Sequence, residues 1–248
     1  MDIDAVVLAA RANTGKLASE SDELLEANID ISGRPMVSYV LSALEGVPEI
    51  SRILLVGPND GLSGYAGGKV TIVEPGKDLI DNAKIGIAHA QTEFVLVSCS
   101  DIPLLTGDIL KDFIAGAVAE NADFVYPVST KEDCIKKYPG VQRTYARLKG
   151  VNLTGGNLFF VRRSTVGKTW PVVEKMIEYR KSPLKMASFL GIGLLLRIFL
   201  GFAGVLEIEE YVSDMLGIKC KALLAVPEIG FDVDKPQDLE LVKAVLGK

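Results

Sequence analysis

Residues 69–98, KVTIVEPGKDLIDNAKIGIAHAQTEFVLVS, contain two short apolar runs separated by an amphipathic stretch. The runs at residues 69–73 and 94–98 are rich in β-branched side chains and predict buried strands. The spacing of apolar positions at residues 78–90 predicts a helix between them. A strand, a helix and a second strand at this spacing are typical of a parallel sheet with helices packed on its faces. The segment therefore predicts an α/β fold.

The same alternation continues along the rest of the chain. Further strands are predicted at residues 3–8, 52–56, 123–128, 158–161 and 221–225, and further helices at residues 36–44, 106–118, 171–179 and 237–246. We therefore expect a three-layer α/β/α arrangement around a mainly parallel sheet. Ligands of such sheets bind at the carboxyl ends of the strands, which points to the loops after Leu8, Val56 and Ser98.

The region between the predicted strands at residues 123–128 and 158–161 differs from the rest. Residues 129–153 are polar and predict a loop-like segment. We expect a single domain over residues 1–248, with a lid-like or inserted region at about residues 129–215. A chain of this length can bury roughly 75% of its unfolded surface, so one large core is feasible.

The composition excludes several classes of protein. The formal net charge is −5 and the isoelectric point is near 5.1, which argues against a nucleic-acid binder that neutralises phosphates. The chain has a single histidine, His89, which argues against a Ser-His-Asp triad and against a metal site built from several histidines. The three cysteines are scattered and odd in number, which favours a reducing cytosol over a disulfide framework. Asp2 and Asp4 interrupt any basic leader, so we expect no signal peptide and a cytoplasmic location.

One apolar stretch is long enough to span a bilayer. Residues 187–206, ASFLGIGLLLRIFLGFAGVL, carry one charge, Arg197, near the midpoint. A central arginine costs roughly 2.5–3.5 kcal/mol on insertion, and four glycines surround it. We expect a buried or groove-forming pair of helices; contact with a membrane surface and a true span are the alternatives.

Three segments carry residues suited to phosphate chemistry. The loop LAARANTGK, residues 8–16, offers backbone N–H groups to an anion, and its Arg11 and Lys16 add charged donors. Asp101 directly follows a predicted buried strand, at the edge of the sheet where ligands bind. Asp232 and Asp234 lie on the same side of the chain if residues 231–235 are extended, and two such carboxylates require a cation or a donor. Carboxylates combined with substrate phosphates are what Mg²⁺ prefers. The alternatives are a solvated loop, an aspartate without a ligand and an exposed turn.

These segments, in this order, resemble the MobA-like NTP transferases, a branch of the nucleotidyltransferases with the glycosyltransferase-A-like, or nucleotide-diphospho-sugar transferase, fold. The resemblance covers most of the chain, and residues 184–216 have no counterpart in it. The segments that carry the resemblance are VVLAA at 6–10, GRPM at 33–36, YVLSAL at 39–44, SDIP at 100–103, TGGN at 154–157 and DVDKPQDL at 232–239.

The resemblance implies a Mg²⁺-dependent enzyme that moves a nucleotidyl group from an NTP to a phosphorylated acceptor and releases pyrophosphate. Molybdopterin, a sugar phosphate or a polyol phosphate would be the acceptor. Such attack on the α-phosphorus needs alignment and charge neutralisation but no histidine. The implied phosphate-binding residues are Leu8, Ala9, Ala10, Arg11, Asn13, Thr14, Gly15, Lys16 and Arg34. The implied metal ligands are Asp101 and Asp234, with Asp232 as an auxiliary carboxylate; Asn82 faces the nucleotide, and Gly155, Gly156 and Asn157 line the acceptor side.

The chain departs from the family at its phosphate loop, which is usually Leu-Ala-Ala-Gly-x-Gly-Thr-Arg. Arg11 and Asn13 stand at the two glycines, Gly15 stands at the arginine, and Glu26 stands where the family has a second basic residue. Arg11 could crowd the phosphates or replace the lost arginine. Two alternatives follow: a nucleotide-binding homologue without transfer activity, and a glycosyltransferase of the same fold that uses an NDP-sugar.

Two further expectations concern charged residues. A glycosyltransferase would favour Asp-x-Asp at the end of the fourth strand, where this chain has Asp101-Ile102-Pro103. A group of basic residues is expected to be a solvated face, with docking of a phosphate-rich acceptor as the alternative. Its members are Lys131, Lys136, Lys137, Arg143, Arg147 and Lys149.

Overall fold

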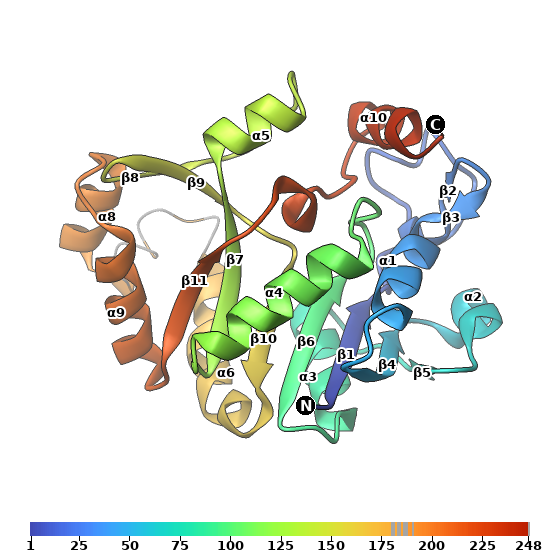
Figure 1. Ribbon diagram of the computed structural model, residues 1–248, viewed down its shortest axis with the longest axis horizontal. Helices are drawn as coiled ribbons and strands as arrows, with labels where there is room; N and C mark the ends of the chain where they lie inside the picture. The colour runs from blue at the N-terminus through green and yellow to red at the C-terminus, as the bar shows by residue number, and fades with distance from the viewer. Residues whose placement is uncertain (180–181, 183–184, 186–187, 190, 248) are drawn as a thin grey trace.

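The computed structural model describes residues 1–179, 182, 185, 188–189 and 191–247, and Figure 1 shows how their helices and strands are arranged. Within this part of the chain a nine-stranded sheet runs in the order β5-β4-β1-β6-β10-β7-β9-β8, and β11 also pairs with β7. Helices cover both faces of the sheet. The three-layer α/β/α fold predicted from the sequence is therefore confirmed.

The sheet consists of β1 (Ile3–Leu8), β4 (Ile50–Val56), β5 (Val70–Val73), β6 (Phe94–Cys99), β7 (Phe124–Thr130), β8 (Ala146–Leu148), β9 (Val151–Gly155), β10 (Leu158–Arg162) and β11 (Cys220–Leu224). A separate two-stranded sheet joins β2 (Asp30–Ile31) and β3 (Arg34–Pro35). The longer helices are α1 (Met36–Glu45), α3 (Leu79–His89), α4 (Gly107–Ala119), α6 (Arg163–Tyr179), α8 (Ile192–Phe199), α9 (Val205–Leu216) and α10 (Pro236–Leu246). The shorter ones are α2 (Asn59–Leu62), α5 (Lys131–Lys137), η1 (Glu26–Asn28), η2 (Ser63–Tyr65) and η3 (Pro227–Gly230).

The strand directions make the sheet mainly parallel. β1 pairs in parallel with both β4 and β6, β5 extends β4, and β11 runs parallel to β7. β10 lies antiparallel between β6 and β7, and β9 lies antiparallel against β7. Because the parallel strands β1, β4 and β6 point the same way, the loops that follow them gather at one edge of the sheet.

Alternation along β1 divides the core into two layers. Ala5 and Val7 point to the face covered by α1 and α4, whereas Val6 points to the face covered by α3. On the first face Leu44 of α1 and Phe113 of α4 pack in the same cluster. Burial on both faces explains why β1 reads as a continuous apolar run rather than as an alternating one.

The polar region at residues 129–153 is more ordered than the sequence indicates. Thr130 caps α5, because its hydroxyl accepts a hydrogen bond from the Asp133 N–H at 3.0 Å. Further on, β8 pairs with β9, and β9 pairs with the end of β7. The prediction of a loop here is wrong, because the partner strand that orders the segment lies elsewhere in the sequence. The single domain with an inserted region at about residues 129–215 stays a proposal, supported by this pairing.

The apolar stretch at residues 187–206 forms α8 and the start of α9, although residues 187 and 190 lie outside the described residues. Arg197 makes a bidentate ion pair with Glu207, in which its Nε and Nη2 atoms donate to the two carboxylate oxygens at 2.7 and 2.8 Å. This pair joins the two helices. None of the residues of α8 is buried, so the expectation of burial is wrong for this helix, while the groove-forming alternative stays a prediction. Within the described residues, no helix combines the length and the apolar character needed to cross a bilayer.

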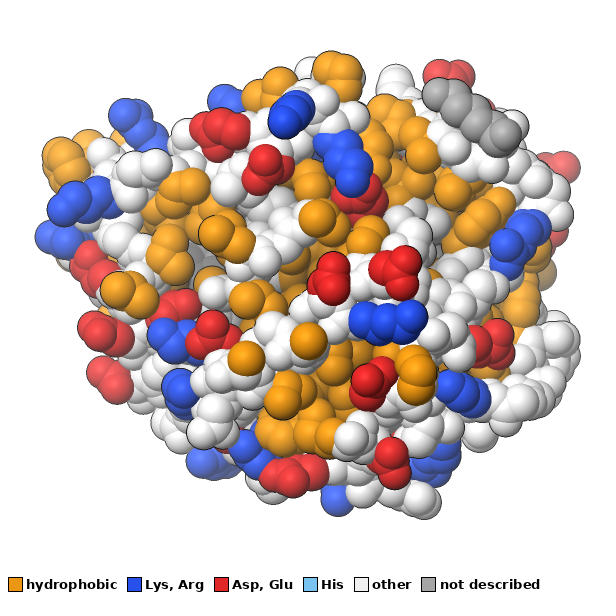
Figure 2. Space-filling view, in the orientation of Figure 1, with side chains coloured by type: hydrophobic (Ala, Val, Ile, Leu, Met, Phe, Trp, Pro, Cys, Tyr) orange, Lys and Arg blue, Asp and Glu red, His pale blue; other side chains and the backbone are white. Residues whose placement is uncertain are grey.

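The surface seen from the side of α4 carries charges of both signs. Figure 2 shows acidic and basic side chains interspersed over this face, with apolar side chains exposed beside α4.

Candidate active site

The loops at the ends of β1 and β6 meet the chain segment that leads into α10. The backbone N–H of Val233 donates to the carbonyl oxygen of Asp101 at 2.9 Å, which fixes Asp232 and Asp234 beside the end of β6. Asn157 ties in a fourth segment, because its carbonyl accepts from the Cys99 N–H at 2.9 Å and its side-chain amide donates to the Gly230 carbonyl at 3.2 Å. Residues from four distant parts of the sequence therefore line one edge of the sheet.

Arg11 connects the first loop to two carboxylates. Its Nη1 lies 2.8 Å from Asp234 Oδ1, and its Nε lies 3.1 Å from Glu26 Oε2. The backbone sets up the second contact, because the Glu26 N–H donates to the Arg11 carbonyl at 3.0 Å and Ala12 forms a bridge with Leu25. Burial raises the pKa of Glu26, and the neighbouring Arg11 opposes this rise. The positive charge of Arg11 thus compensates the negative charge of Glu26, and both residues are departures from the family pattern.

The side chain of Asp101 has a carboxylate oxygen that no protein donor satisfies among the described residues. Its Oδ1 is buried and, among the described residues, has no hydrogen-bond partner. Burial, followed by the carboxylates of Asp232 and Asp234, raises the pKa of Asp101 to about 7. Asp232 is itself held by Arg143, whose Nη1 lies 2.8 Å from its Oδ1. Burial raises the pKa of Asp232, although Arg143 works against the rise.

These carboxylates do not form a ready-made metal centre. Within the described part of the chain, no group of three or more His, Cys, Asp or Glu side chains is arranged to hold a metal ion. Asp101 and Asp234 as metal ligands, with Asp232 as an auxiliary carboxylate, stay a prediction; in this structure Arg11 pairs with Asp234 and Arg143 pairs with Asp232. The orphaned Oδ1 of Asp101 nevertheless fits a divalent cation whose remaining ligands come from phosphate and water.

Tyr126 of β7 contacts two of the glycines that the family resemblance assigns to the acceptor side, Gly155 and Gly156. Its hydroxyl donates to the Gly156 carbonyl at 2.9 Å, and a Cβ atom added at Gly155 would lie 2.3 Å from that hydroxyl oxygen. Only glycine therefore fits at position 155 while the Tyr126 ring lies over it. Burial raises the pKa of Tyr126, and the neighbouring Cys99 and then Asp232 add to the rise.

Comparisons with known proteins agree with this geometry. The model of the MobA-like NTP transferase domain matches residues 25–180, which is more than half of the chain. The chain belongs to the MobA-like NTP transferase family. That membership makes it an enzyme of the nucleotidyltransferase type.

Individual relatives are more distant. The bifunctional protein GlmU of Desulfotalea psychrophila is 27% identical over 117 residues, which cover 43% of this chain and 32% of GlmU. The chain thus matches about a third of the length of that curated relative. A solved structure described as a hypothetical transferase from Thermus thermophilus is 33% identical, with a TM-score of 0.86 over 96% of this chain and 100% of the other. The 4-diphosphocytidyl-2C-methyl-D-erythritol synthase from Anaerococcus prevotii is 13% identical, with a TM-score of 0.64 over 100% and 99% of the chains, and shows the shared fold alone.

Two residues that the sequence assigned to the site of this MobA-like transferase have other contacts. The Arg34 guanidinium donates to Ser42 Oγ at 2.8 Å and lies over the Tyr39 ring, both on α1. Asn82 is buried, and its Oδ1 accepts from the Gly76 N–H at 2.7 Å, so its amide shapes the loop before α3. Neither residue joins the carboxylates by any contact among the described residues.

The remaining loop residues divide by exposure. Thr14, Gly15 and Lys16 are exposed at the tip of the loop, whereas Leu8, Ala9 and Ala10 lie at the end of β1. The side-chain amide of Asn13 donates to the carbonyls of Ser21 and Glu23 at 2.9 and 3.0 Å, so it shapes the loop rather than facing outward.

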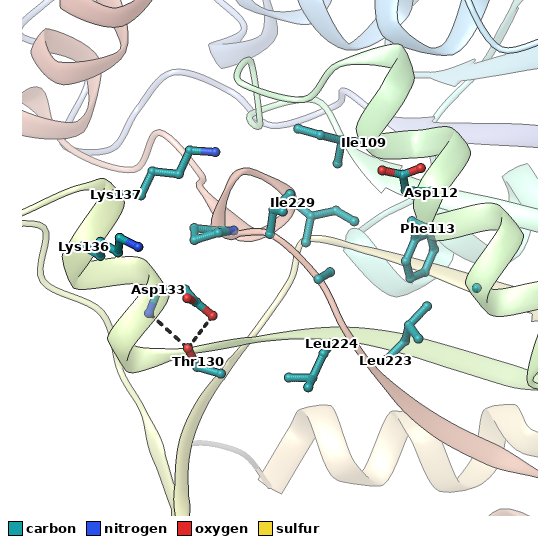
Figure 3. A pocket seen from close by; sticks show the side chains of 14 residues that line it. Ile109, Asp112, Phe113, Thr130, Asp133, Lys136, Lys137, Leu223, Leu224 and Ile229 are labelled. Atoms are coloured by element: carbon teal, nitrogen blue, oxygen red, sulfur yellow. Dashed lines mark hydrogen bonds between the residues drawn. The ribbon is translucent and has the colours of Figure 1, made fainter.

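Sequence reasoning missed two residues of this transferase site. Arg143 was expected to belong to a solvated basic face, but its side chain is 14% exposed and pairs with Asp232. In contrast, Lys136 and Lys137 line a hollow of about 750 Å³ between α4 and α5 (Figure 3). Lys137 also pairs with Glu228. Tyr126 was not singled out; its only signal is the alternation of Phe124, Tyr126 and Val128 along one face of β7.

Proposed function

We propose that the chain transfers a nucleotidyl group from an NTP to a phosphorylated acceptor, with Mg²⁺ bound at Asp101 and Asp234. An oxygen of the acceptor phosphate forms a bond to the α-phosphorus. The bond between the α-phosphorus and the bridging oxygen to the β-phosphate breaks, and pyrophosphate leaves with the electron pair. When bound, the metal would neutralise charge on the phosphates. The observation that supports this assignment is the buried Oδ1 of Asp101, which has no hydrogen-bond partner among the described residues, together with the rise that the carboxylates of Asp232 and Asp234 add to the pKa of Asp101.

The roles of the other residues follow from their contacts. Arg11 and Lys16 supply positive charge on the loop after β1. The N–H groups of Ala9, Asn13 and Thr14 already donate to backbone carbonyls, so phosphate oxygens would be bound by other N–H groups of the loop, at residues 10–12 and 15. In this structure Arg11 neutralises Asp234. A cation at Asp234 would release the Arg11 Nη1 group for a phosphate. Arg143 positions Asp232, and Gly155, Gly156 and Asn157 face the acceptor.

The test combines binding with turnover. Calorimetry with each NTP in the presence of Mg²⁺ measures binding, and a pyrophosphate-release screen over phosphorylated acceptors measures transfer. Asp101→Asn is expected to lower pyrophosphate release by roughly 100-fold, the order seen when one charge-stabilising group is lost. Asp108→Asn is the matched control, because the Asp108 side chain is 93% exposed on α4.

Three outcomes separate the alternatives. Absence of binding by every NTP at submillimolar concentration contradicts the proposal. Binding without pyrophosphate release with any acceptor favours a homologue that has lost transfer. Unchanged Mg²⁺-dependent binding in Asp101→Asn shows that the metal assignment is wrong.

A further inference from the structure

A large apolar cavity lies next to the acceptor side. It has a volume of about 660 Å³ and lies between the β7–β11 part of the sheet and the helices α6 and α9. Its floor includes Phe124, Tyr126 and Val128, which share one face of β7 because alternate strand residues point the same way. Its walls include Trp170 of α6 and Val212 of α9. An apolar cavity of about 150 Å³ suffices to bind benzene, so this one has room for a much larger apolar group.

The charged groups of the cavity wall and the buried hydroxyl of Thr169 are already paired within the protein. Glu209 pairs with Lys221 at 2.6 Å and accepts the Ala222 N–H at 2.8 Å, so its charge is answered by the protein. The Thr169 hydroxyl donates to the Val166 carbonyl at 3.0 Å. The four buried side-chain atoms without a partner, in the part of the chain that the structure describes, all lie outside this wall; they belong to Asn13, Glu26, Asp101 and Glu228. A polar ligand would therefore find few free hydrogen-bonding groups in the cavity, whereas an apolar ligand has no hydrogen bonds to give up when it leaves water.

The cavity borders the candidate active site at Tyr126 and Gly155. Tyr126 and Gly155 belong to its wall, and the Tyr126 hydroxyl bonds the carbonyl of Gly156 on the acceptor side. A molecule with its phosphate near Asp101 and Asp232 could thus pass the Tyr126 ring and place an attached chain in the cavity.

We propose that the cavity binds the apolar chain of the acceptor, so that the acceptor is a phosphate monoester of a long-chain alcohol. This inference rests on the proposed nucleotidyl transfer and names the acceptor class for it. The phosphate oxygen of the ester attacks the α-phosphorus of the NTP, and the product carries a diphosphate between the nucleoside and the chain. Pyrophosphate leaves with the electron pair of the broken bond.

The wall of the cavity leads to an exposed apolar surface. Val205 lines the cavity, and its neighbour Leu206 is 67% exposed. Phe202, in the turn before α9, is 61% exposed. This surface gives an apolar chain a route from outside, either as a free amphiphile or from a lipid layer.

The direct test is a chain-length series with the full-length protein. Butyl, octyl and dodecyl phosphate are titrated by calorimetry below the concentrations at which they form micelles, with and without NTP and Mg²⁺. Burial of a methylene is expected to raise affinity about fourfold, so dodecyl phosphate should bind far more tightly than butyl phosphate. Equal affinities for the butyl and dodecyl esters overturn the inference.

A matched pair of variants tests the location. Val212→Trp fills the cavity and is expected to weaken dodecyl phosphate binding by about tenfold or more. Asp214→Trp adds the same side chain at an exposed position of α9 and should leave the affinity unchanged. Equal loss in both variants, or in neither, contradicts the assignment to this cavity. The chain-length series on the unaltered protein decides the matter if Val212→Trp does not fold.

The titrations with and without NTP and Mg²⁺ also distinguish a failure of this inference from a failure of the proposed function. If NTP and Mg²⁺ bind while chain length has no effect, the long-chain acceptor is wrong and nucleotidyl transfer stands. If chain length matters while no NTP binds, the cavity binds apolar chains but the inference fails as an acceptor assignment, together with the proposed function. A further experiment measures co-sedimentation with phosphatidylcholine vesicles that contain dodecyl phosphate. Co-sedimentation that is lost in Phe202→Ser would support the inference and identify a lipid layer as the source of the acceptor. Binding of dodecyl phosphate only from solution would support the inference and identify a free amphiphile as the source.

Discussion

The Arg11 guanidinium lies 2.8 Å from the carboxylate of Asp234, and this contact joins the loop after the first strand to the segment before the last helix. The same guanidinium lies 3.1 Å from the buried carboxylate of Glu26. Arg11 and Glu26 are both departures from the usual phosphate loop of the family. Their contact gives a physical reason why an acidic residue is tolerated beside a proposed triphosphate site.

The first prediction concerns the stability of this pair. Arg11→Ala leaves Glu26 buried without its counter-charge and is expected to lower the free energy of unfolding by about 1 kcal/mol at pH 8. Arg11→Ala with Glu26→Gln should recover most of the loss, as measured by urea unfolding. Lys16→Ala, at an exposed position, serves as the control. A double variant no more stable than Arg11→Ala would contradict the coupling.

The second prediction concerns Asp101 and pH. Its pKa is 3.8 in the unfolded chain and about 7 in the folded protein, so the folded protein binds more protons between these values. Stability therefore falls as the pH rises from about 4 to about 7. Asp101→Asn removes this penalty and should raise the free energy of unfolding at pH 8 by up to about 4 kcal/mol, at about 1.4 kcal/mol per pKa unit.

Urea unfolding at pH 4 and pH 8, without divalent cations, measures this effect. The difference between Asp101→Asn and the unaltered protein should be small at pH 4 and large at pH 8. Asp108→Asn should show no such dependence. A difference that does not change with pH would show that Asp101 is not the group responsible.

The parallel part of the fold could be predicted because local patterns determine it. The strands near residues 3–8, 52–56 and 94–98 are apolar runs that are buried on both faces, and each lies where the sequence indicates. The regular secondary structure within residues 129–153 could not be predicted, because β9 depends on pairing with β7, and β8 on pairing with β9, rather than on their own composition.

The candidate site was predictable to a similar extent. Asp101, Asp232 and Asp234 converge because they follow strands or lie in the segment that packs against one. The partner of Arg143 was not predictable, because nothing near it in the sequence indicates that it reaches Asp232. Arg34 and Asn82 fit a family pattern, but local hydrogen bonds hold both side chains.

The third prediction concerns Arg143 as a positioning residue for Asp232. Burial raises the pKa of Asp232 and Arg143 opposes the rise, so Arg143→Ala should raise that pKa further. The acidic limb of the pH–rate profile for pyrophosphate release is expected to move to higher pH. Arg143→Lys should restore part of the shift, because it keeps the charge but not the planar guanidinium. An unchanged profile in Arg143→Ala contradicts the role.

The fourth prediction separates folding from function. Asp4 is a buried residue of β1, where Arg52 of the neighbouring β4 donates to its carboxylate at 2.6 and 3.2 Å and the Gln91 N–H donates to it at 2.6 Å. Burial alone would raise the pKa of Asp4, but these bonds lower it overall, so its contribution to stability is present above pH 3.8 and is lost as the pH falls below that value. Asp4→Ala should lower the free energy of unfolding by about 3 kcal/mol at pH 7. The dissociation constant for NTP should stay the same in the folded variant; a marked change would show that Asp4 also affects the site.

The last prediction concerns the contact between Gly155 and Tyr126. A Cβ at position 155 would lie 2.3 Å from the Tyr126 hydroxyl oxygen, so Gly155→Ala must displace the ring and break its hydrogen bond to Gly156. The KM for the acceptor is expected to rise, while the affinity for NTP stays unchanged, because the displaced ring lies on the acceptor side. Adding Tyr126→Ala to Gly155→Ala relieves the clash and should recover the stability lost by Gly155→Ala. Gly167→Ala is the matched control, since a Cβ there meets no atom within 4 Å and the added methyl group favours the helix by up to about 1 kcal/mol. A Gly155→Ala variant that weakens NTP and acceptor equally would place Tyr126 outside the acceptor side and would remove the link between the site and the apolar cavity.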